Sequence, residues 1–156
     1  TKPTDHVLNI VQKDDPRTGQ KGWSFIERAY NFDSAAGIDY TVDVTKPFGS
    51  RIVITSMADG KPFSMDETYN VAMTSYRASG GGGLLAEVGI DTDKIAERTV
   101  EYYPEIREIL YEYLKKNRVI DPAVIGDPAK IGHWSFVPEN IAGPAIERDI
   151  NLIFKK

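Results

Sequence analysis

Four consecutive glycines, Gly80–Gly83, divide this chain into two halves of different character. Before them, apolar residues alternate with polar ones, which is typical of β-strands; after them, the apolar spacing becomes helical. Glycine loses more backbone entropy on folding than any other residue, so an ordered protein keeps such a run where something must approach the backbone closely. The run therefore predicts strands, then a site of close approach, then helices.

Three strands are predicted before the glycines. They run from Ile38 to Val44, from Arg51 to Met57 and from Tyr69 to Tyr76. Asp59-Gly60 predicts a turn after the second of them. Residues 1–22 are polar and interrupted by proline and glycine, so we expect the first 25 residues to contribute little to the core.

Two helices are predicted after the glycines. Asp91 or Thr92 can cap a helix that continues to about Tyr103, and Pro104 fits the first position of a second helix that ends near Asn117. A short strand is expected at Trp134–Val137. The rest of the tail should be irregular, because it carries four prolines: Pro122, Pro128, Pro138 and Pro144. Strands followed by helices favour an α+β fold with a mixed or antiparallel sheet packed by helices.

Size and composition limit what the chain can be. A length of 156 residues favours one domain, and the predicted elements give it a thin core, so residues 1–156 are expected to form a single, partial domain. The net charge of -4 argues against nucleic-acid polymers as partners. No apolar run reaches the length of about 18 residues that a membrane-spanning helix needs. The absence of cysteine excludes disulfides and thiolate zinc sites.

The sequence carries no recognisable catalytic motif. His6 and His133 lie near opposite ends of the chain, and neither has carboxylates or a second histidine at the spacing of a metal site. A Gly-x-Ser-x-Gly motif is absent, and no phosphate-loop lysine follows the glycines. We therefore expect no cofactor, no metal and no catalytic residue in this chain.

Binding chemistry is concentrated just before the glycines. Tyr76 offers a ring, Arg77 a cation, and the glycines backbone amides, a combination that suits a small, flat, anionic ligand such as a nucleotide. The alternative for Arg77 is a solvated charge rather than a phosphate or sugar contact. The alternative for the glycines is a flexible bend.

A second aromatic motif comprises Tyr30, Asn31, Phe32 and Asp33. One interpretation makes the two rings core residues and the two polar residues turn-makers. The other makes one ring half of a base clamp, meaning two aromatic rings that hold a nucleobase between them, with Tyr76 as the other half. Stacking contributes about 1–3 kcal/mol per base and tolerates any base.

At these motifs the chain resembles a known family. Residues 30–40, 45–47 and 76–82 closely resemble the C-terminal domain of the 5'-nucleotidase and 2',3'-cyclic-nucleotide 2'-phosphodiesterase family. The resemblance implies an α+β specificity domain that holds the nucleobase between two aromatic rings. Tyr76 matches one ring, and Phe32, or else Tyr30, matches the other. It assigns base or ribose binding to the nine residues Tyr30, Asn31, Phe32, Asp33, Tyr76, Arg77, Gly80, Gly81 and Gly82.

The resemblance also implies what lies outside the chain. Family members carry an N-terminal metallophosphoesterase domain with two divalent metals, so we expect such a partner in cis or in trans, acting in nucleotide catabolism in the periplasm or at the cell surface. We expect the chain to lack the start of the family's domain and to be a fragment, inactive as a phosphohydrolase alone. Unpaired strand edges then predict self-association. The alternatives are a stand-alone nucleotide-binding or interaction module and, less favoured, an autonomous phosphatase.

One departure from the family pattern concerns the substrate. Members that act on 5'-nucleotides usually carry Gly-Gly-Asp after the second ring, and the aspartate accepts hydrogen bonds from the ribose hydroxyls. Gly82 stands at that position in this chain. A 2',3'-cyclic phosphate has no free vicinal hydroxyls, so the substitution favours the cyclic-nucleotide branch over the 5'-nucleotidase branch.

Overall fold

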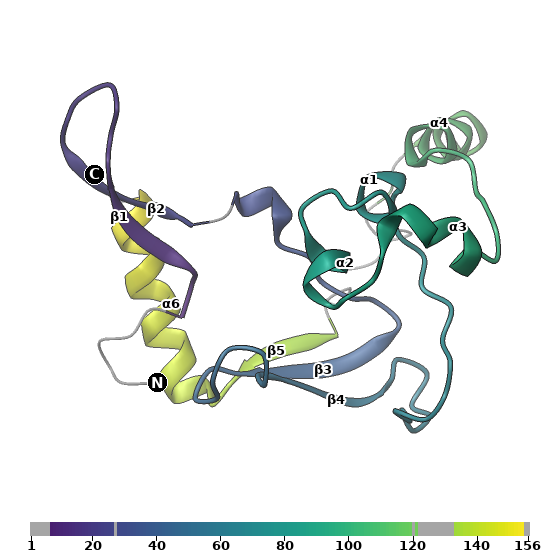
Figure 1. The fold of residues 1–156 in the computed structure, drawn as a ribbon, viewed down its shortest axis with the longest axis horizontal. Helices are drawn as coiled ribbons and strands as arrows, with labels where there is room; N and C mark the ends of the chain where they lie inside the picture. The colour runs from purple at the N-terminus through teal and green to yellow at the C-terminus, as the bar shows by residue number, and fades with distance from the viewer. Residues whose placement is uncertain (1–6, 27, 120, 122–132, 155–156) are drawn as a thin grey trace. The chain divides into compact units, whose positions relative to one another are not determined.

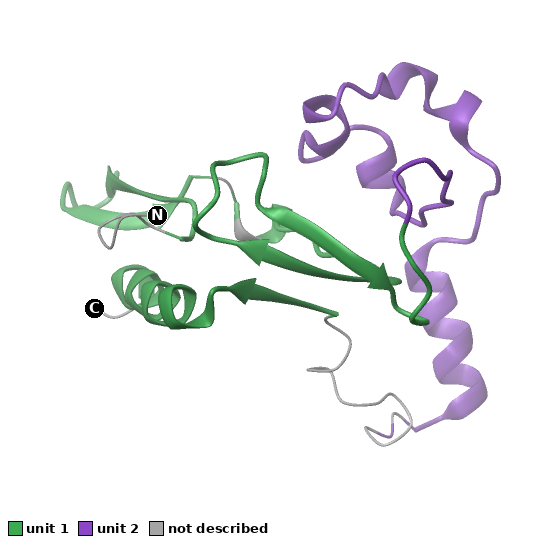
Figure 2. Ribbon diagram, turned by 90° about the horizontal axis from the view of Figure 1, so that it is seen from below, with its two compact units in different colours: residues 1–63, 128–156 green, residues 64–127 purple. Residues whose placement is uncertain are grey.

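The structure of the chain is a computed structural model that describes residues 7–26, 28–119, 121 and 133–154. It divides into two compact units (Figure 2): unit 1 comprises residues 1–63 and 128–156, and unit 2 comprises residues 64–127. One domain can contain two compact units, so the single partial domain expected from the sequence stays a prediction. Each unit is described by itself.

Unit 1 begins with a two-stranded hairpin (Figure 1). β1 (Ile10–Asp14) pairs antiparallel with β2 (Lys21–Phe25). The Asp15 carbonyl accepts a hydrogen bond from the Gly19 amide at 2.7 Å and closes the turn. The hairpin buries Ile10, whose side chain is part of the core. The described part of the first 25 residues thus supplies an ordered hairpin but, in Ile10, a single core residue, in line with the expectation that this segment contributes little to the core.

A three-stranded mixed sheet forms the centre of unit 1. Its order is β4 (Ile52–Met57), β3 (Ile38–Asp43) and β5 (Trp134–Val137), with β3 antiparallel to β4 and parallel to β5. The three corresponding sequence predictions are confirmed, as is the turn at Asp59-Gly60, where Gly60 has a φ of +84°. Val44, which follows β3, is fully buried. Strand alternation therefore located the sheet correctly.

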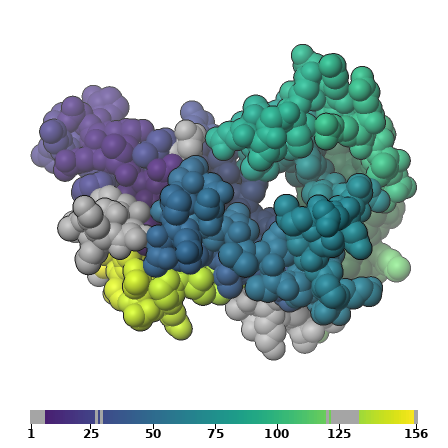
Figure 3. Space-filling view, turned by 60° about the horizontal axis from the view of Figure 1, so that its bottom comes forward, coloured from purple at the N-terminus to yellow at the C-terminus, as the bar shows by residue number. Residues whose placement is uncertain are grey.

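The C-terminal part of unit 1 is a helix, α6 (Glu139–Phe154), which packs against β5 and β2. In the space-filling view, its yellow residues lie beside the blue segment that contains β3 and β4 (Figure 3). The prediction of an irregular tail is wrong here, although Pro144 lies inside the helix. Helical spacing of apolar residues outweighs the hydrogen bond that proline removes. Pro122 and Pro128 lie outside the described residues.

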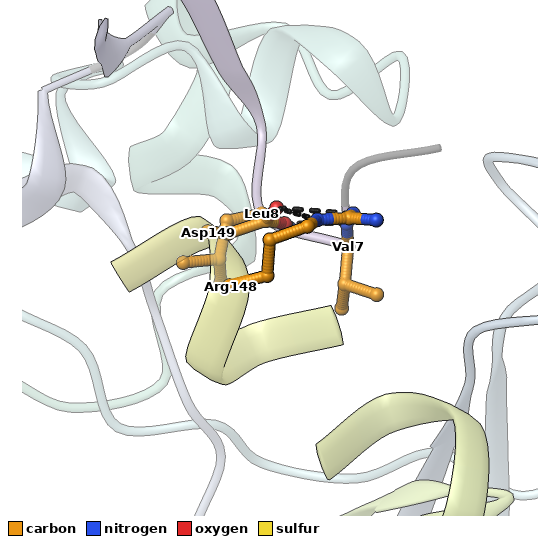
Figure 4. A network of polar contacts seen from close by, with 4 residues as sticks. All are labelled: Val7, Leu8, Arg148 and Asp149. Atoms are coloured by element: carbon orange, nitrogen blue, oxygen red, sulfur yellow. Dashed lines mark hydrogen bonds and ion pairs between the residues drawn. The ribbon is translucent and has the colours of Figure 1, made fainter. Parts of the chain in front are cut away.

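A buried carboxylate fastens the start of the described chain to α6 (Figure 4). Asp149 is 0% exposed, and its Oδ2 accepts hydrogen bonds from the amides of Val7 at 2.7 Å and Leu8 at 3.0 Å. Arg148 donates to the other oxygen, Oδ1, from Nε at 3.2 Å and Nη2 at 3.1 Å. Buried charges are stable only when they are paired and hydrogen-bonded, and this one is both.

Unit 2 is built from short helices: α1 (Ser75–Ala78), α2 (Leu84–Glu87), the 3-10 turn η2 (Thr92–Lys94), α3 (Ile95–Arg98) and the longer α4 (Ile106–Asn117). The strand predicted from Tyr69 to Tyr76 is wrong. Residues 69–74 are irregular, and Thr74 caps a helical turn that contains Tyr76. Alternation makes a segment suitable for a sheet, but the described residues provide no partner strand there.

The helix predicted from Asp91 to Tyr103 is shorter than expected. Asp91 caps the 3-10 turn η2, since its side chain accepts a hydrogen bond from the Asp93 amide at 3.1 Å, and α3, which follows η2, ends at Arg98. The helix predicted to end near Asn117 is confirmed by α4. Its apolar stripe, however, is exposed in this unit: Ile106, Ile109, Leu110, Tyr113 and Leu114. None of the helices in the described residues is both long enough and apolar enough to span a membrane.

Candidate functional site

Tyr76 lies on a single helical turn immediately before the glycines. The turn is held at its start by Thr74, whose Oγ1 accepts a hydrogen bond from the Arg77 amide at 3.4 Å. The Tyr76 side chain is 56% exposed. A large aromatic ring that remains exposed is available to stack on a flat ligand.

The glycine run forms a tight loop with bonds inside it. The amides of Gly80, Gly81 and Gly83 donate to the carbonyls of Arg77, Tyr76 and Gly80 at 3.0, 2.8 and 3.0 Å. Gly80, Gly82 and Gly83 have φ values of +91°, +77° and +76°, which glycine adopts at no steric cost. Three of the four amides thus donate within the loop, and they are not the bare donors that the sequence suggested.

Gly81 is the position where something approaches the backbone closely. A Cβ atom built there would lie 2.5 Å from both Cε2 and Cζ of Tyr76, far inside van der Waals contact. The same Cβ would also lie 2.5 Å from the backbone carbonyl oxygen of Tyr76, so both the turn and the ring require glycine here. A close approach to the backbone is thus present at Gly81, where the approaching groups are the ring and the carbonyl of Tyr76, and the approach of a ligand to the glycines stays a prediction.

Arg77 contacts both the loop and the ring. Its Nη1 donates to the Gly81 carbonyl at 3.0 Å, and its Cζ lies over the Tyr76 ring, 5.4 Å from the centroid. Arg77 is therefore more than a solvated charge, and its contact with a phosphate or sugar stays a prediction. Leu85 in α2, the helix that follows the loop, is buried.

The second motif lies in unit 1, around the 3-10 turn η1 (Ala29–Asn31). Tyr30 and Phe32 are 66% and 67% exposed, so the interpretation of these rings as core residues is wrong. The hydroxyl of Tyr30 accepts a hydrogen bond from Nη1 of Arg28, and the Cζ of Arg28 lies 5.7 Å from the Tyr30 ring centroid. The Asn31 amide donates to the Arg28 carbonyl at 2.8 Å, and Asp33 is exposed.

Phe32 rests on an aromatic cluster that the sequence did not reveal. Its ring centroid lies 5.9 Å from that of Trp134, which stacks on the buried Tyr40 at 5.8 Å and 10° and meets Phe136 edge-on at 5.1 Å. Tyr40 and Trp134 are opposite each other in the β3–β5 register. The pairing joins strands almost 100 residues apart, and only the aromatic content of the two strands hinted at it.

Polar side chains occupy neighbouring positions of the same sheet. His133 Nδ1 lies 2.8 Å from Asp39 Oδ1, and Ser56 Oγ donates to Asp39 Oδ2 at 3.1 Å. His6 lies outside the described residues. Within the described residues, no three His, Asp or Glu side chains come together as metal ligands. His133 thus has a structural partner.

The two motifs belong to different units, with Tyr30–Asp33 in unit 1 and Tyr76–Gly82 in unit 2. Each motif has an exposed aromatic ring that contacts another residue of its own unit: Phe32 contacts Trp134, and Tyr76 contacts Gly81. The pairing of a unit 1 ring with Tyr76 as a base clamp stays a prediction.

Comparison with known proteins gives a family and two relatives. The family described as "5'-nucleotidase, C-terminal domain" matches residues 5–88, which include both motifs. The chain is 31% identical over 140 residues to "Trifunctional nucleotide phosphoesterase protein YfkN" of Bacillus subtilis, covering 82% of the chain and 8% of that protein. It is 29% identical over 140 residues to "2',3'-cyclic-nucleotide 2'-phosphodiesterase/3'-nucleotidase" of Haemophilus influenzae, covering 78% of the chain and 19% of that protein. The chain thus spans a small part of each relative, and no solved structure matches it.

Proposed function

The chain belongs to the 5'-nucleotidase C-terminal domain family, and from that premise we propose that it binds the nucleoside part of a nucleotide for a phosphohydrolase. The observation that carries the proposal is that two aromatic rings within the family match are exposed, and that each is packed against another residue of its own unit. Phe32 rests on Trp134, and Tyr76 rests on Gly81. Two such rings suit a base clamp, in which stacking contributes about 1–3 kcal/mol per base.

The phosphate chemistry is assigned in this proposal to a second domain. We expect a metallophosphoesterase domain with two divalent metals, in cis or in trans, acting in the periplasm or at the cell surface. The names of both relatives describe phosphoesterase or phosphodiesterase activity, and most of each relative lies outside the segment that this chain matches. The role proposed for this chain is to select and hold the substrate.

The substrate class in the proposal is a 2',3'-cyclic nucleotide rather than a 5'-nucleotide. Gly82 has no side chain with which to accept hydrogen bonds from a free pair of ribose hydroxyls, and a 2',3'-cyclic phosphate has no such pair to donate. The φ of +77° at Gly82 also disfavours most other residues there. Of the two relatives, the protein from Haemophilus influenzae carries a cyclic-nucleotide activity in its name.

Calorimetry with adenosine, AMP and 2',3'-cyclic AMP tests the proposal. The chain should bind all three, with the cyclic nucleotide bound at least as well as AMP. Tyr76→Ala should weaken each about tenfold or more, because it removes one stacked ring. Tyr102→Ala is the matched control, since it removes another exposed tyrosine of unit 2. Absence of binding by the wild-type chain, or unchanged affinity in Tyr76→Ala, would overturn the proposal.

A further inference from the structure

We propose that Arg77 is a positioning residue for the Tyr76 ring and not a contact of the ligand's phosphate. The inference rests on the proposed function, since it concerns how that site is held. It differs from the sequence-based expectation, in which a cation beside a ring suggested a phosphate or sugar contact.

The Tyr76 ring is exposed on a short helical turn. Tyr76 is 56% exposed on a helix of four residues, and a helix that short is not stable by itself. An exposed side chain on such a turn would sample several rotamers in the absence of other contacts. The ring is nevertheless seated beside Gly81, where a Cβ would come within 2.5 Å of Cε2 and Cζ. Because Gly81 has no side chain, it leaves the space that the ring occupies, which we call the Gly81 seat.

The Arg77 guanidinium contacts both the glycine loop and the Tyr76 ring. Arg77 is the next residue along the helix, and it reaches forward to donate from Nη1 to the Gly81 carbonyl at 3.0 Å. In the same position its Cζ lies over the Tyr76 ring, 5.4 Å from the centroid. The planar guanidinium of Arg77 therefore binds the Gly81 carbonyl through a hydrogen bond and the Tyr76 ring through a cation–π contact.

The consequence is a thermodynamic signature. A ring fixed before the ligand arrives loses less conformational entropy when the base stacks on it. Loss of Arg77 should therefore weaken a nucleoside and a nucleotide by the same factor, because both carry the base. A phosphate-binding arginine would give a different result, since its loss would weaken the nucleotide alone.

The experiment measures adenosine and AMP affinities by calorimetry for the wild-type chain, Arg77→Ala and Arg77→Lys. Arg98→Ala is the control, as it removes another arginine of unit 2. Arg77→Ala should weaken both ligands about fivefold and leave the ratio of the two dissociation constants unchanged. Arg77→Lys should remain weakened for both, because it keeps the charge without the planar fork. A selective loss of AMP binding in Arg77→Ala, or AMP binding restored by lysine, would overturn the inference.

A measurement without ligand separates this inference from the proposed function. The ring current of Tyr76 should displace the NMR resonances of Gly81 in the free chain, and the displacement should disappear in Tyr76→Ala. Arg77→Ala should reduce it markedly, and Arg98→Ala should leave it unchanged. If Arg77→Ala retains the full displacement, Arg77 does not position the ring. If the wild-type chain binds neither ligand while the displacement behaves as expected, the proposed function fails and the positioning role stands.

Discussion

Replacing Asp149 should destabilise unit 1 more than any surface change on the same helix. The carboxylate is 0% exposed and accepts the amides of Val7 and Leu8 at 2.7 and 3.0 Å. In Asp149→Ala both amides lose their acceptor, and Arg148 loses the anion that it contacts at 3.1 Å. The start of the described chain would then lose these two bonds to α6.

The magnitude follows from these contacts. Hydrogen bonds to a charged group contribute about 1.5–3 kcal/mol each, and removing one partner of a buried charge pair costs about 3–5 kcal/mol. Both amides and the Arg148 side chain are partly exposed, so water can replace some of the lost bonds. We therefore expect Asp149→Ala to lower the free energy of unfolding by about 3 kcal/mol. Asp149→Asn should cost about 2 kcal/mol, because one oxygen remains while the new amide donors face Arg148.

Urea unfolding, followed by the fluorescence of Trp23 and Trp134 in unit 1, measures this loss. Glu147→Ala, an exposed carboxylate on the same helix, is the matched control and should change the stability by less than about 0.5 kcal/mol. Hydrogen exchange of the Val7 and Leu8 amides should accelerate in Asp149→Ala alone. Equal stabilities for Asp149→Ala and Glu147→Ala would refute the reasoning that this carboxylate holds the N-terminal segment.

Three further predictions concern single side chains. Phe32→Ala should weaken adenosine binding about tenfold by calorimetry, and Tyr30→Ala should weaken it less, because only Phe32 rests on the Trp134 cluster; the opposite order would assign the clamp to Tyr30. Gly82→Asp should improve AMP binding relative to 2',3'-cyclic AMP, because only AMP has free vicinal hydroxyls, and an equal change in both affinities would contradict this. The Thr45 hydroxyl and amide, which donate hydrogen bonds to the Asp43 carboxylate, lower the pKa of Asp43 below its ordinary value. Because the folded-state pKa is lowered, this stabilisation is present at neutral pH and is lost as the pH falls through the lowered value. An NMR titration should find the Asp43 pKa shifted upward in Thr45→Ala.

The spacing of apolar residues along the sequence predicts those strands and helices whose formation depends on neighbouring residues. Alternation located β3 and β4, and the helical spacing located α4. The same reasoning failed at residues 69–76, because alternation reports only that a segment could join a sheet. Whether a partner strand lies beside it depends on residues far away in the chain. The hydroxyl of Thr74, a good helix cap, was the local sign of the turn that forms instead.

The tail shows a second kind of failure. The prolines predict an irregular tail, yet Pro144 lies within α6. The stronger signal was an apolar helical face that includes Ala142 and a charge, Asp149, on the same buried side. A carboxylate on an apolar face indicates a buried partner, but the partner amides lie more than 140 residues earlier in the chain. Sequence spacing has no means of locating such a contact.

The glycine run illustrates how a correct prediction of close approach can leave the approaching group unknown. The glycine run predicts that a ligand approaches the backbone, whereas the group that lies against the backbone at Gly81 is the ring of Tyr76. On a strand, pleat and sheet contacts would fix the direction of that ring. On a helical turn of four residues, the Thr74 cap, the Gly81 seat and the Arg77 guanidinium have to fix it. Any substitution at one of these three positions should therefore change the affinity for every base by a similar factor, because it acts on the ring and not on a base-specific contact.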